Sequence, residues 1–182
     1  VPGGFALMYK VLSRFEETGR CRRGYFVDSL GGAQFSTPEV VDRLRSFSET
    51  LEGRHTETAA VTLAACDPAN PYGAALSWPQ TRAAEDAPRH RPGRKAGGLV
   101  VLVDGALVLF VERGGRTVLT FGNDPGALRS ACTSLAATVK RGSVDKIVVE
   151  KVDGQSIHGH DFTELLAEAG FSATPRGYRL RA

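Results

Sequence analysis

The sequence predicts an α+β fold in two parts, and two kinds of pattern support this. Up to about residue 55, apolar residues recur at three- and four-residue steps, which indicates amphipathic helices. Between residues 98 and 121, apolar runs are separated by Asp104-Gly105 and Gly114-Gly115, pairs that are typical of β-hairpin turns. A chain of 182 residues is long enough for two small domains. We place the boundary at the polar stretch 52–55, which gives domains at 1–55 and 56–182.

The first 35 residues predict a helix followed by a basic hairpin. One side of the helix is apolar and consists of Phe5, Met8, Leu12 and Phe15. Gly19 ends the helix, because the residue just past the last turn often needs a positive φ. A strand over 24–27 and a turn at 28–32 follow, and the chain returns through 34–35. A helix followed by a basic two-stranded wing is the second half of a winged helix, a module that places its last helix in a DNA groove and its wing on the backbone.

Residues 36–51 predict a second helix. Ser36 or Thr37 can cap it, and Pro38 suits its first turn. Glu39 stands three residues after Ser36, as in a capping box. The expected apolar face consists of Val40, Leu44, Phe47 and Leu51. The helices that normally precede the recognition helix of a winged helix are missing, so we expect this chain to be the C-terminal piece of a longer protein.

The second part predicts short strands with two helices. Strands are expected at 60–65, at three runs within 98–121, at 146–150 and at 178–181. The meander 98–121 is apolar on both faces, so we expect a small antiparallel sheet that is curled or covered, in a β-barrel-like domain. Helices are expected after Asp124-Pro125 and over 161–169. The buried stripe of the first of these should be Leu128, Cys132, Leu135 and Val139.

Composition argues against several classes of protein. The net charge of +3 is only mildly basic, so a nucleic-acid hypothesis has to rest on how the charge is distributed. Three widely spaced cysteines without a CxxC pair argue against a disulfide framework and favour a reducing cytosol. No apolar run approaches the ~20 residues of a membrane span. No G-x-x-x-x-G-K-[ST] loop is present, so we expect no ATPase motor and no cofactor in this chain.

Basic residues around the predicted wing are candidates for DNA contact, because each one that neutralises a phosphate releases counterions and so adds non-specific affinity. These candidates are Lys10, Arg14, Arg20, Arg22 and Arg23. The alternative is a solvated basic face without a ligand, since Glu16 and Glu17 at the helix end would repel phosphate. The exposed helix face has no Asn or Gln to read adenine, so direct base readout is not expected.

A second candidate is the polar loop 80–97, which is rich in arginine. Its basic side chains, Arg94 and Lys95 among them, would follow a single strand or RNA, and Trp78 would stack on a base. The alternative is a solubilising loop with Trp78 in the core.

Two further motifs suggest chemistry. Asp67 would orient water or stabilise a cationic sugar in a glycosylase, or else it caps its own backbone in an Asp-Pro turn. Residues 158–161, His-Gly-His-Asp, would supply three metal ligands. No fourth ligand is evident and a helix cap explains the motif more simply, so we predict no metal site.

Four long motifs occur in one order: PGGFALMYKVLSRFEETGRCRRGYFVDSLGGAQF, AACDPANPYGAALSWP, GRKAGGLVVLVDGALVLFVERGGRTVLTF and RGYRLR. These motifs and their order resemble the C-terminal end of Lhr, a family of large helicase-related, superfamily 2 DNA-dependent ATPases of bacteria. The resemblance is strongest to the actinobacterial members of the family. The resemblance implies an accessory module downstream of an ATP- and Mg-dependent 3′–5′ DNA repair helicase core. It also implies DNA or an RNA–DNA hybrid as partner, self-association into a homo-oligomer, and a cytoplasmic, nucleoid-associated location.

The same pairing of modules more distantly resembles the winged-helix DNA glycosylases, which remove alkylated or crosslinked bases. Their Gln-containing catalytic motif has no convincing counterpart here, since Gln34 lies in the wing. Uracil glycosylase activity is connected with the C-terminal region of Lhr proteins. Two alternatives therefore stay open: a glycosylase for uracil or alkylated bases that uses a carboxylate-activated water, and an oligomerisation domain without DNA contact.

Overall fold

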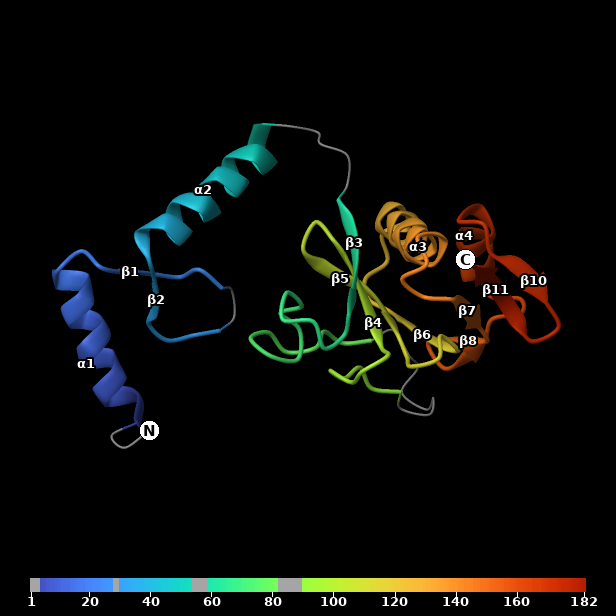
Figure 1. Cartoon of the computed structure of the whole chain (residues 1–182), viewed down its shortest axis with the longest axis horizontal. Helices are drawn as coiled ribbons and strands as arrows, with labels where there is room; N and C mark the ends of the chain where they lie inside the picture. The colour runs from blue at the N-terminus through green and yellow to red at the C-terminus, as the bar shows by residue number, and fades with distance from the viewer. Residues whose placement is uncertain (1–3, 28–29, 54–58, 82–89) are drawn as a thin grey trace. The chain divides into compact units, whose positions relative to one another are not determined.

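The chain forms two compact units, 1–57 and 58–182, in a computed structural model that describes residues 4–27, 30–53, 59–81 and 90–182 (Figure 1). Each unit is treated by itself below. Both contain helices and antiparallel strands, so the predicted α+β class is confirmed.

The first unit has the predicted order of helix, hairpin and helix. Its elements are α1 (Gly4–Glu17), β1 (Arg22–Gly24), β2 (Gln34–Ser36) and α2 (Pro38–Gly53). The strand predicted at 24–27 instead begins at Arg22 and ends at Gly24. Beyond Gly24 a side chain replaces the strand ladder, since Gln34 Oε1 accepts the backbone N–H groups of Phe26 and Val27 at 2.9 and 2.8 Å.

Helix α1 contacts the wing through Tyr9, which lies outside the predicted apolar side. Tyr9 and Ser13 are half-buried, and the Tyr9 ring meets Phe35 edge-on, with 5.9 Å between centroids. On the predicted apolar side Leu12 is half-buried, whereas Phe5 is 69%, Met8 44% and Phe15 39% exposed. The helix was predicted correctly, but most of its predicted apolar side is exposed, and the ring that meets the wing is that of Tyr9, whose hydroxyl also accepts from Arg23.

The second unit contains two sheets and two helices among the described residues. The larger sheet has the order β3-β4-β5-β6-β8-β9, and the smaller has the order β10-β11-β7. The strands of the larger sheet are β3 (Ala60–Ala64), β4 (Leu99–Val103), β5 (Ala106–Val111), β6 (Thr117–Thr120), β8 (Lys151–Val152) and β9 (Gln155–Ser156). The remaining elements are β7 (Lys146–Val149), β10 (Ser172–Thr174), β11 (Gly177–Arg181), α3 (Pro125–Lys140) and α4 (Phe162–Glu168).

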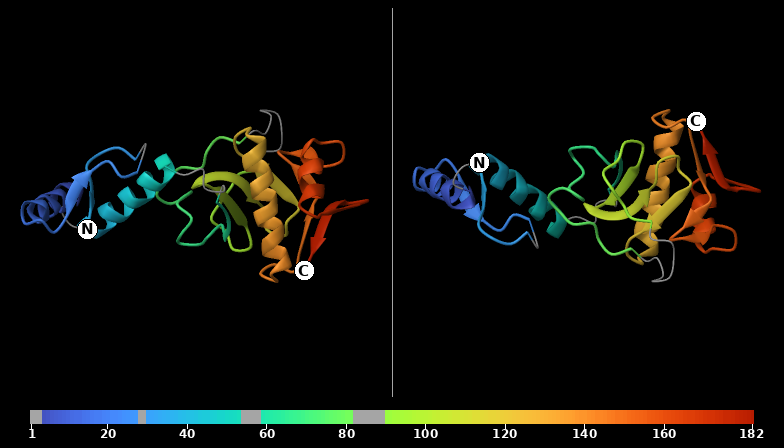
Figure 2. Two further views of the ribbon diagram at one scale, coloured as in Figure 1. Left: turned by 90° about the horizontal axis from the view of Figure 1, so that it is seen from above. Right: turned by 90° about the horizontal axis from the view of Figure 1, so that it is seen from below.

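The predicted barrel-like closure is not confirmed. Within the described residues the larger sheet ends in β3 on one side and β9 on the other, so it is open. The chain leaves this sheet after β6 through α3, and β7 then pairs with β11 instead of extending the larger sheet. Helix α3 packs against β3, β4 and β5 on one side and against α4 and β11 on the other (Figure 2).

Both faces of the meander β4–β5–β6 are buried, as its apolar pattern predicted. Side chains alternate across a strand, so Val100 and Val101 serve different cores. The α3 side buries the predicted stripe of Leu128, Cys132, Leu135 and Val139. The opposite side packs Leu102, Phe110 and Leu119 against Tyr72 and Trp78.

Asp124 caps α3 by accepting the Ala127 N–H at 2.8 Å. Among the described helices, none has both the length and the apolar character needed to cross a bilayer.

The reactivity of the three cysteine thiols should show which of them are buried. Burial raises the pKa of Cys132 to about 12, and the charge of Glu168 adds to the rise. Cys21 is also buried and donates its thiol to the Leu12 carbonyl at 3.3 Å, whereas Cys66 is exposed. We expect an aromatic disulfide reagent at mildly alkaline pH to label Cys66 alone in the folded chain and all three thiols after unfolding. Cys66→Ser should abolish labelling of the folded chain, and rapid labelling of Cys132 would contradict the described packing.

Candidate nucleic-acid interface

Arg22 and Arg23 point to opposite sides of β1, because side chains alternate along a strand. Arg22 Nη1 lies 3.5 Å from Asp42 Oδ1 on α2. Arg23 Nη1 donates to the Tyr9 hydroxyl at 2.9 Å, and its Nε lies 3.4 Å from Glu16 Oε2 on α1. The guanidinium groups of the two predicted arginines therefore pair with different helices, Arg22 with α2 and Arg23 with α1.

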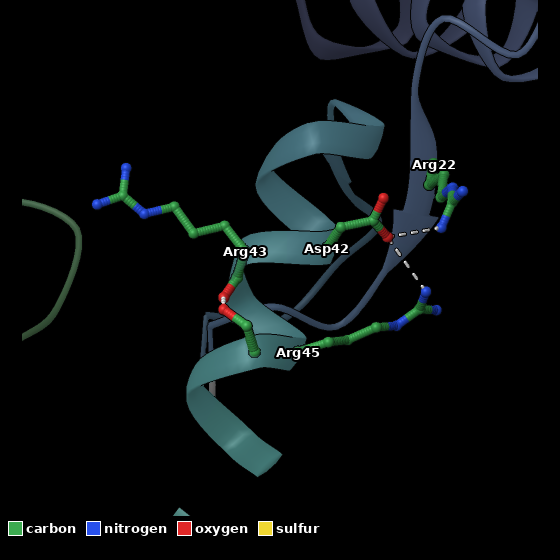
Figure 3. A network of polar contacts seen from close by, with 5 residues as sticks. Arg22, Asp42, Arg43 and Arg45 are labelled. Atoms are coloured by element: carbon green, nitrogen blue, oxygen red, sulfur yellow. Dashed lines mark hydrogen bonds and ion pairs between the residues drawn. The ribbon is translucent and has the colours of Figure 1, made fainter. Parts of the chain in front are cut away.

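Asp42 holds two guanidinium groups at once (Figure 3). Its Oδ1 lies 3.5 Å from Arg22 Nη1 and 3.4 Å from Arg45 Nη1. All three side chains are exposed, so the ion pairs add little to stability. Two cations beside one carboxylate nevertheless leave a local excess of positive charge. Arg45 was missed as a candidate, although its three-residue spacing from Asp42 on a predicted helix was the available signal.

An open hollow of about 440 Å³ lies beside this cluster, and we call it the wing hollow. Its lining combines strand and helix residues: Arg22, Arg23, Gly24, Tyr25, Phe26, Val41, Leu44 and Arg45. Val41 is buried and Leu44 is apolar, so α2 contributes an apolar floor. Tyr25 is 88% exposed. The wing hollow thus joins an apolar floor, a cationic rim and an uncovered aromatic ring.

The start of α2 favours negative charge. The pKa of the Glu39 carboxyl is lowered by its own backbone N–H, then by the Thr37 hydroxyl, and the charge of Arg22 adds to this. Charge along the sequence agrees, because residues 4–45 carry seven lysines and arginines against five acidic residues, whereas residues 46–57 carry one against three. The first unit as a whole is therefore neutral, and its basic residues are concentrated before residue 46, in the part of the chain that contains the wing and the start of α2.

The other predicted contacts of this unit are exposed but spread out. Lys10 and Arg14 lie on α1, and both are exposed. The Arg20 guanidinium lies 5.6 Å from the centre of the Phe15 ring, which is a cation–π contact. These three residues do not gather around a common partner. In the described part of this unit, Arg22 and Arg45 do so, since both contact the Asp42 carboxylate.

Arg94 organises a turn of the second unit. Its guanidinium donates to the backbone carbonyls of Asn70 at 2.6 Å, Asp67 at 3.0 Å, and Tyr72 and Cys66 at 3.3 Å. A half-buried guanidinium with four protein acceptors has little left for a phosphate. Lys95 is exposed. Residues 82–89 of the predicted loop, which include two further arginines, lie outside the described residues.

Trp78 packs on the sheet. Its ring stacks on Tyr72 with 6.5 Å between centroids and meets Phe110 edge-on at 5.8 Å. Gly73 has a φ of +74°, and a side chain there would collide with the indole. Trp78 is half-buried against the core, which lies closer to the alternative that the sequence analysis kept than to a ring free for base stacking.

Asp67 caps its own turn, since its Oδ1 accepts the Ala69 N–H at 2.8 Å. His160 Nδ1 likewise accepts the Phe162 N–H at 3.1 Å at the start of α4. Across the described ranges, no group of three or more His, Cys, Asp or Glu side chains is placed to hold a metal ion.

Comparison with known proteins supports the family resemblance. Residues 1–56 match the family model for the winged-helix domain of large helicase-related protein. The whole chain is 53% identical to "Lhr helicase/ probable uracil glycosylase" of Mycolicibacterium smegmatis, and 97% of it is 35% identical to "Lhr helicase/uracil glycosylase" of Escherichia coli K12. The chain spans 12% and 11% of the length of these two relatives. The resemblance to a C-terminal region of Lhr is thereby confirmed.

Replacement of Arg94 should loosen the turn that covers the sheet. A lysine has a single ammonium and cannot reach four carbonyls, so Arg94→Lys should lower the free energy of unfolding by about 2 kcal/mol, the scale of hydrogen bonds to charged groups. Urea unfolding followed by far-UV circular dichroism would measure this. Arg91→Lys, at an exposed site three residues away, is the matched control. Equal stability of the two variants would mean that Arg94 does not hold the turn.

Proposed function

Since the chain resembles the C-terminal region of Lhr proteins, we propose that it is an accessory module of a helicase of that family that holds nucleic acid through its phosphates. The observation that carries this proposal is the Arg22–Asp42–Arg45 cluster. The cluster lies at the wing, and the wing is the part of a winged helix that contacts the DNA backbone. Phosphate contacts of this kind position a nucleic acid without reading its bases.

The wider context of the parent protein is part of the same proposal. An ATP- and Mg-dependent motor would lie elsewhere in the parent chain, and its work would be DNA repair on DNA or an RNA–DNA hybrid in the cytoplasm, at the nucleoid. The module would also support assembly into a homo-oligomer. The uncovered apolar side of α1, with Phe5, Met8 and Phe15, supports this second role, because surfaces of this kind mark protein contacts.

The second candidate is a DNA glycosylase, favoured by the names of both relatives, which include uracil glycosylase. Asp67 is the predicted carboxylate. One of its oxygens is engaged by the Ala69 N–H, and the residue is only half-buried. A carboxylate of this kind would have to activate water from its remaining acceptor positions.

Salt dependence of DNA binding tests the first candidate. The logarithm of the affinity should fall linearly with the logarithm of the salt concentration, with a slope of roughly 0.9 for each phosphate contacted. The double variant Arg22→Ala/Arg45→Ala should lower the magnitude of that slope by about 1 to 2. Fluorescence anisotropy with labelled DNA at several salt concentrations measures it.

Arg129→Ala is the matched control, because Arg129 is an exposed arginine of the second unit that pairs with Glu168. The proposal is wrong if the wild-type chain shows no salt-sensitive binding, or if both variants change the slope equally. Absence of binding together with a molar mass above 19.4 kDa in light scattering would favour a pure oligomerisation domain.

Base excision tests the second candidate. The chain would be incubated with uracil-containing and alkylated DNA and then treated with alkali, which breaks the strand at abasic sites. A glycosylase that uses Asp67 should lose activity on the order of a hundredfold in Asp67→Asn. Asparagine keeps an oxygen for the Ala69 N–H, so the turn should be retained. Cleavage that is equal in both proteins would assign the activity to other residues, and no cleavage would dismiss this candidate.

A further inference from the structure

The wing hollow contains the three kinds of surface that a nucleotide needs. Its rim carries Arg22 and Arg45, its floor consists of Val41 and Leu44, and Tyr25 stands at its side. Its volume of about 440 Å³ falls within the roughly 300–1,000 Å³ of small-ligand sites. The outer part of the hollow is open, so a ligand could enter without movement of the backbone.

The rim is spaced for a single phosphate group. Arg22 Nη1 and Arg45 Nη1 each lie within 3.5 Å of the same Asp42 oxygen, so the two nitrogens are at most twice that distance apart. The oxygens of one phosphate can accept from two guanidinium groups at such a separation. The Asp42 carboxylate holds the two guanidinium groups near one another, and a bound phosphate would share them with that carboxylate.

Tyr25 supplies the aromatic component. Tyr25 is 88% exposed, so its ring contributes almost no buried apolar surface to its own unit. Phe26, the next residue along the chain, shows the contrast: it is half-buried, with its ring against Gly24. An aromatic ring that is left uncovered beside two arginines is the arrangement on which unpaired bases stack.

We propose that the wing hollow is a subsite for one unpaired nucleotide, with its phosphate on Arg22 and Arg45 and its base stacked on Tyr25. This rests on the proposed function and adds a strand preference to it. In a duplex both faces of each base are covered by neighbouring base pairs, so Tyr25 can reach a base face only where the strand is single or opened. The chain therefore binds single-stranded nucleic acid more tightly than duplex of the same length.

The test compares three fluorescein-labelled probes by anisotropy: a short oligothymidylate, a duplex of the same length, and an abasic single strand that keeps the phosphates. Tyr25→Ala should weaken oligothymidylate binding about 5- to 150-fold, the range of one base stacked on an aromatic ring. Duplex and abasic-strand binding should be unchanged. Arg45→Ala should weaken binding of all three probes, because every probe carries phosphates.

Two control variants lie on α2 outside the wing hollow. Phe47→Ala removes an aromatic ring that is 57% exposed, and Arg43→Ala removes an arginine that points away from the Asp42 cluster (Figure 3). Neither should distinguish base-containing from abasic strands. Melting temperatures of all variants would exclude loss of folding as the cause.

The outcomes separate the two proposals. Salt-sensitive binding of oligothymidylate that Tyr25→Ala leaves unchanged overturns the nucleotide subsite and keeps the phosphate-binding function. Equal weakening of all three probes by Tyr25→Ala also overturns it, because stacking affects only strands with accessible bases. No binding of any probe by the wild-type chain overturns both proposals.

Discussion

The second unit depends on one constraint: the meander β4–β5–β6 is apolar on both faces, and water has to be excluded from each. Helix α3 covers one face with a regular stripe of side chains. On the other face the covering residues that the structure describes include Tyr72 and Trp78, which belong to an irregular turn. A turn can do this only if its backbone carbonyls are satisfied, and Arg94 and the buried Asn70 satisfy them.

The first unit has the opposite character. Among its described residues only Cys21 and Val41 are buried, each with 7% exposed, and α1 contributes no buried residue. Helices of this length take most of their stability from tertiary contacts, so a helix that leaves Phe5 69% and Met8 44% exposed is incompletely stabilised by its own unit. This agrees with the proposed role in assembly, where a neighbouring surface would complete the packing.

Sequence patterns predicted the elements better than they predicted the partners of individual side chains. Periodicity and turn pairs located α1, the β4–β6 meander and α3, since these depend on local rules. The orientation of α1 and the openness of the larger sheet were beyond those rules, because both depend on which surfaces meet in space. The candidate residues show the same limit. The arginines around the wing were visible in the sequence, but only the structure shows that Arg22 and Arg23 pair with different helices and that Arg45 joins Arg22 at Asp42. It also shows that Arg94 donates to four backbone carbonyls.

The placement of Trp78 has a practical consequence. It is the only tryptophan of the chain, and it lies against Phe110 in the second unit. Its intrinsic emission therefore reports on the packing of the second unit. Comparison of this emission with a signal from the whole backbone would tell whether the two units melt together or one at a time.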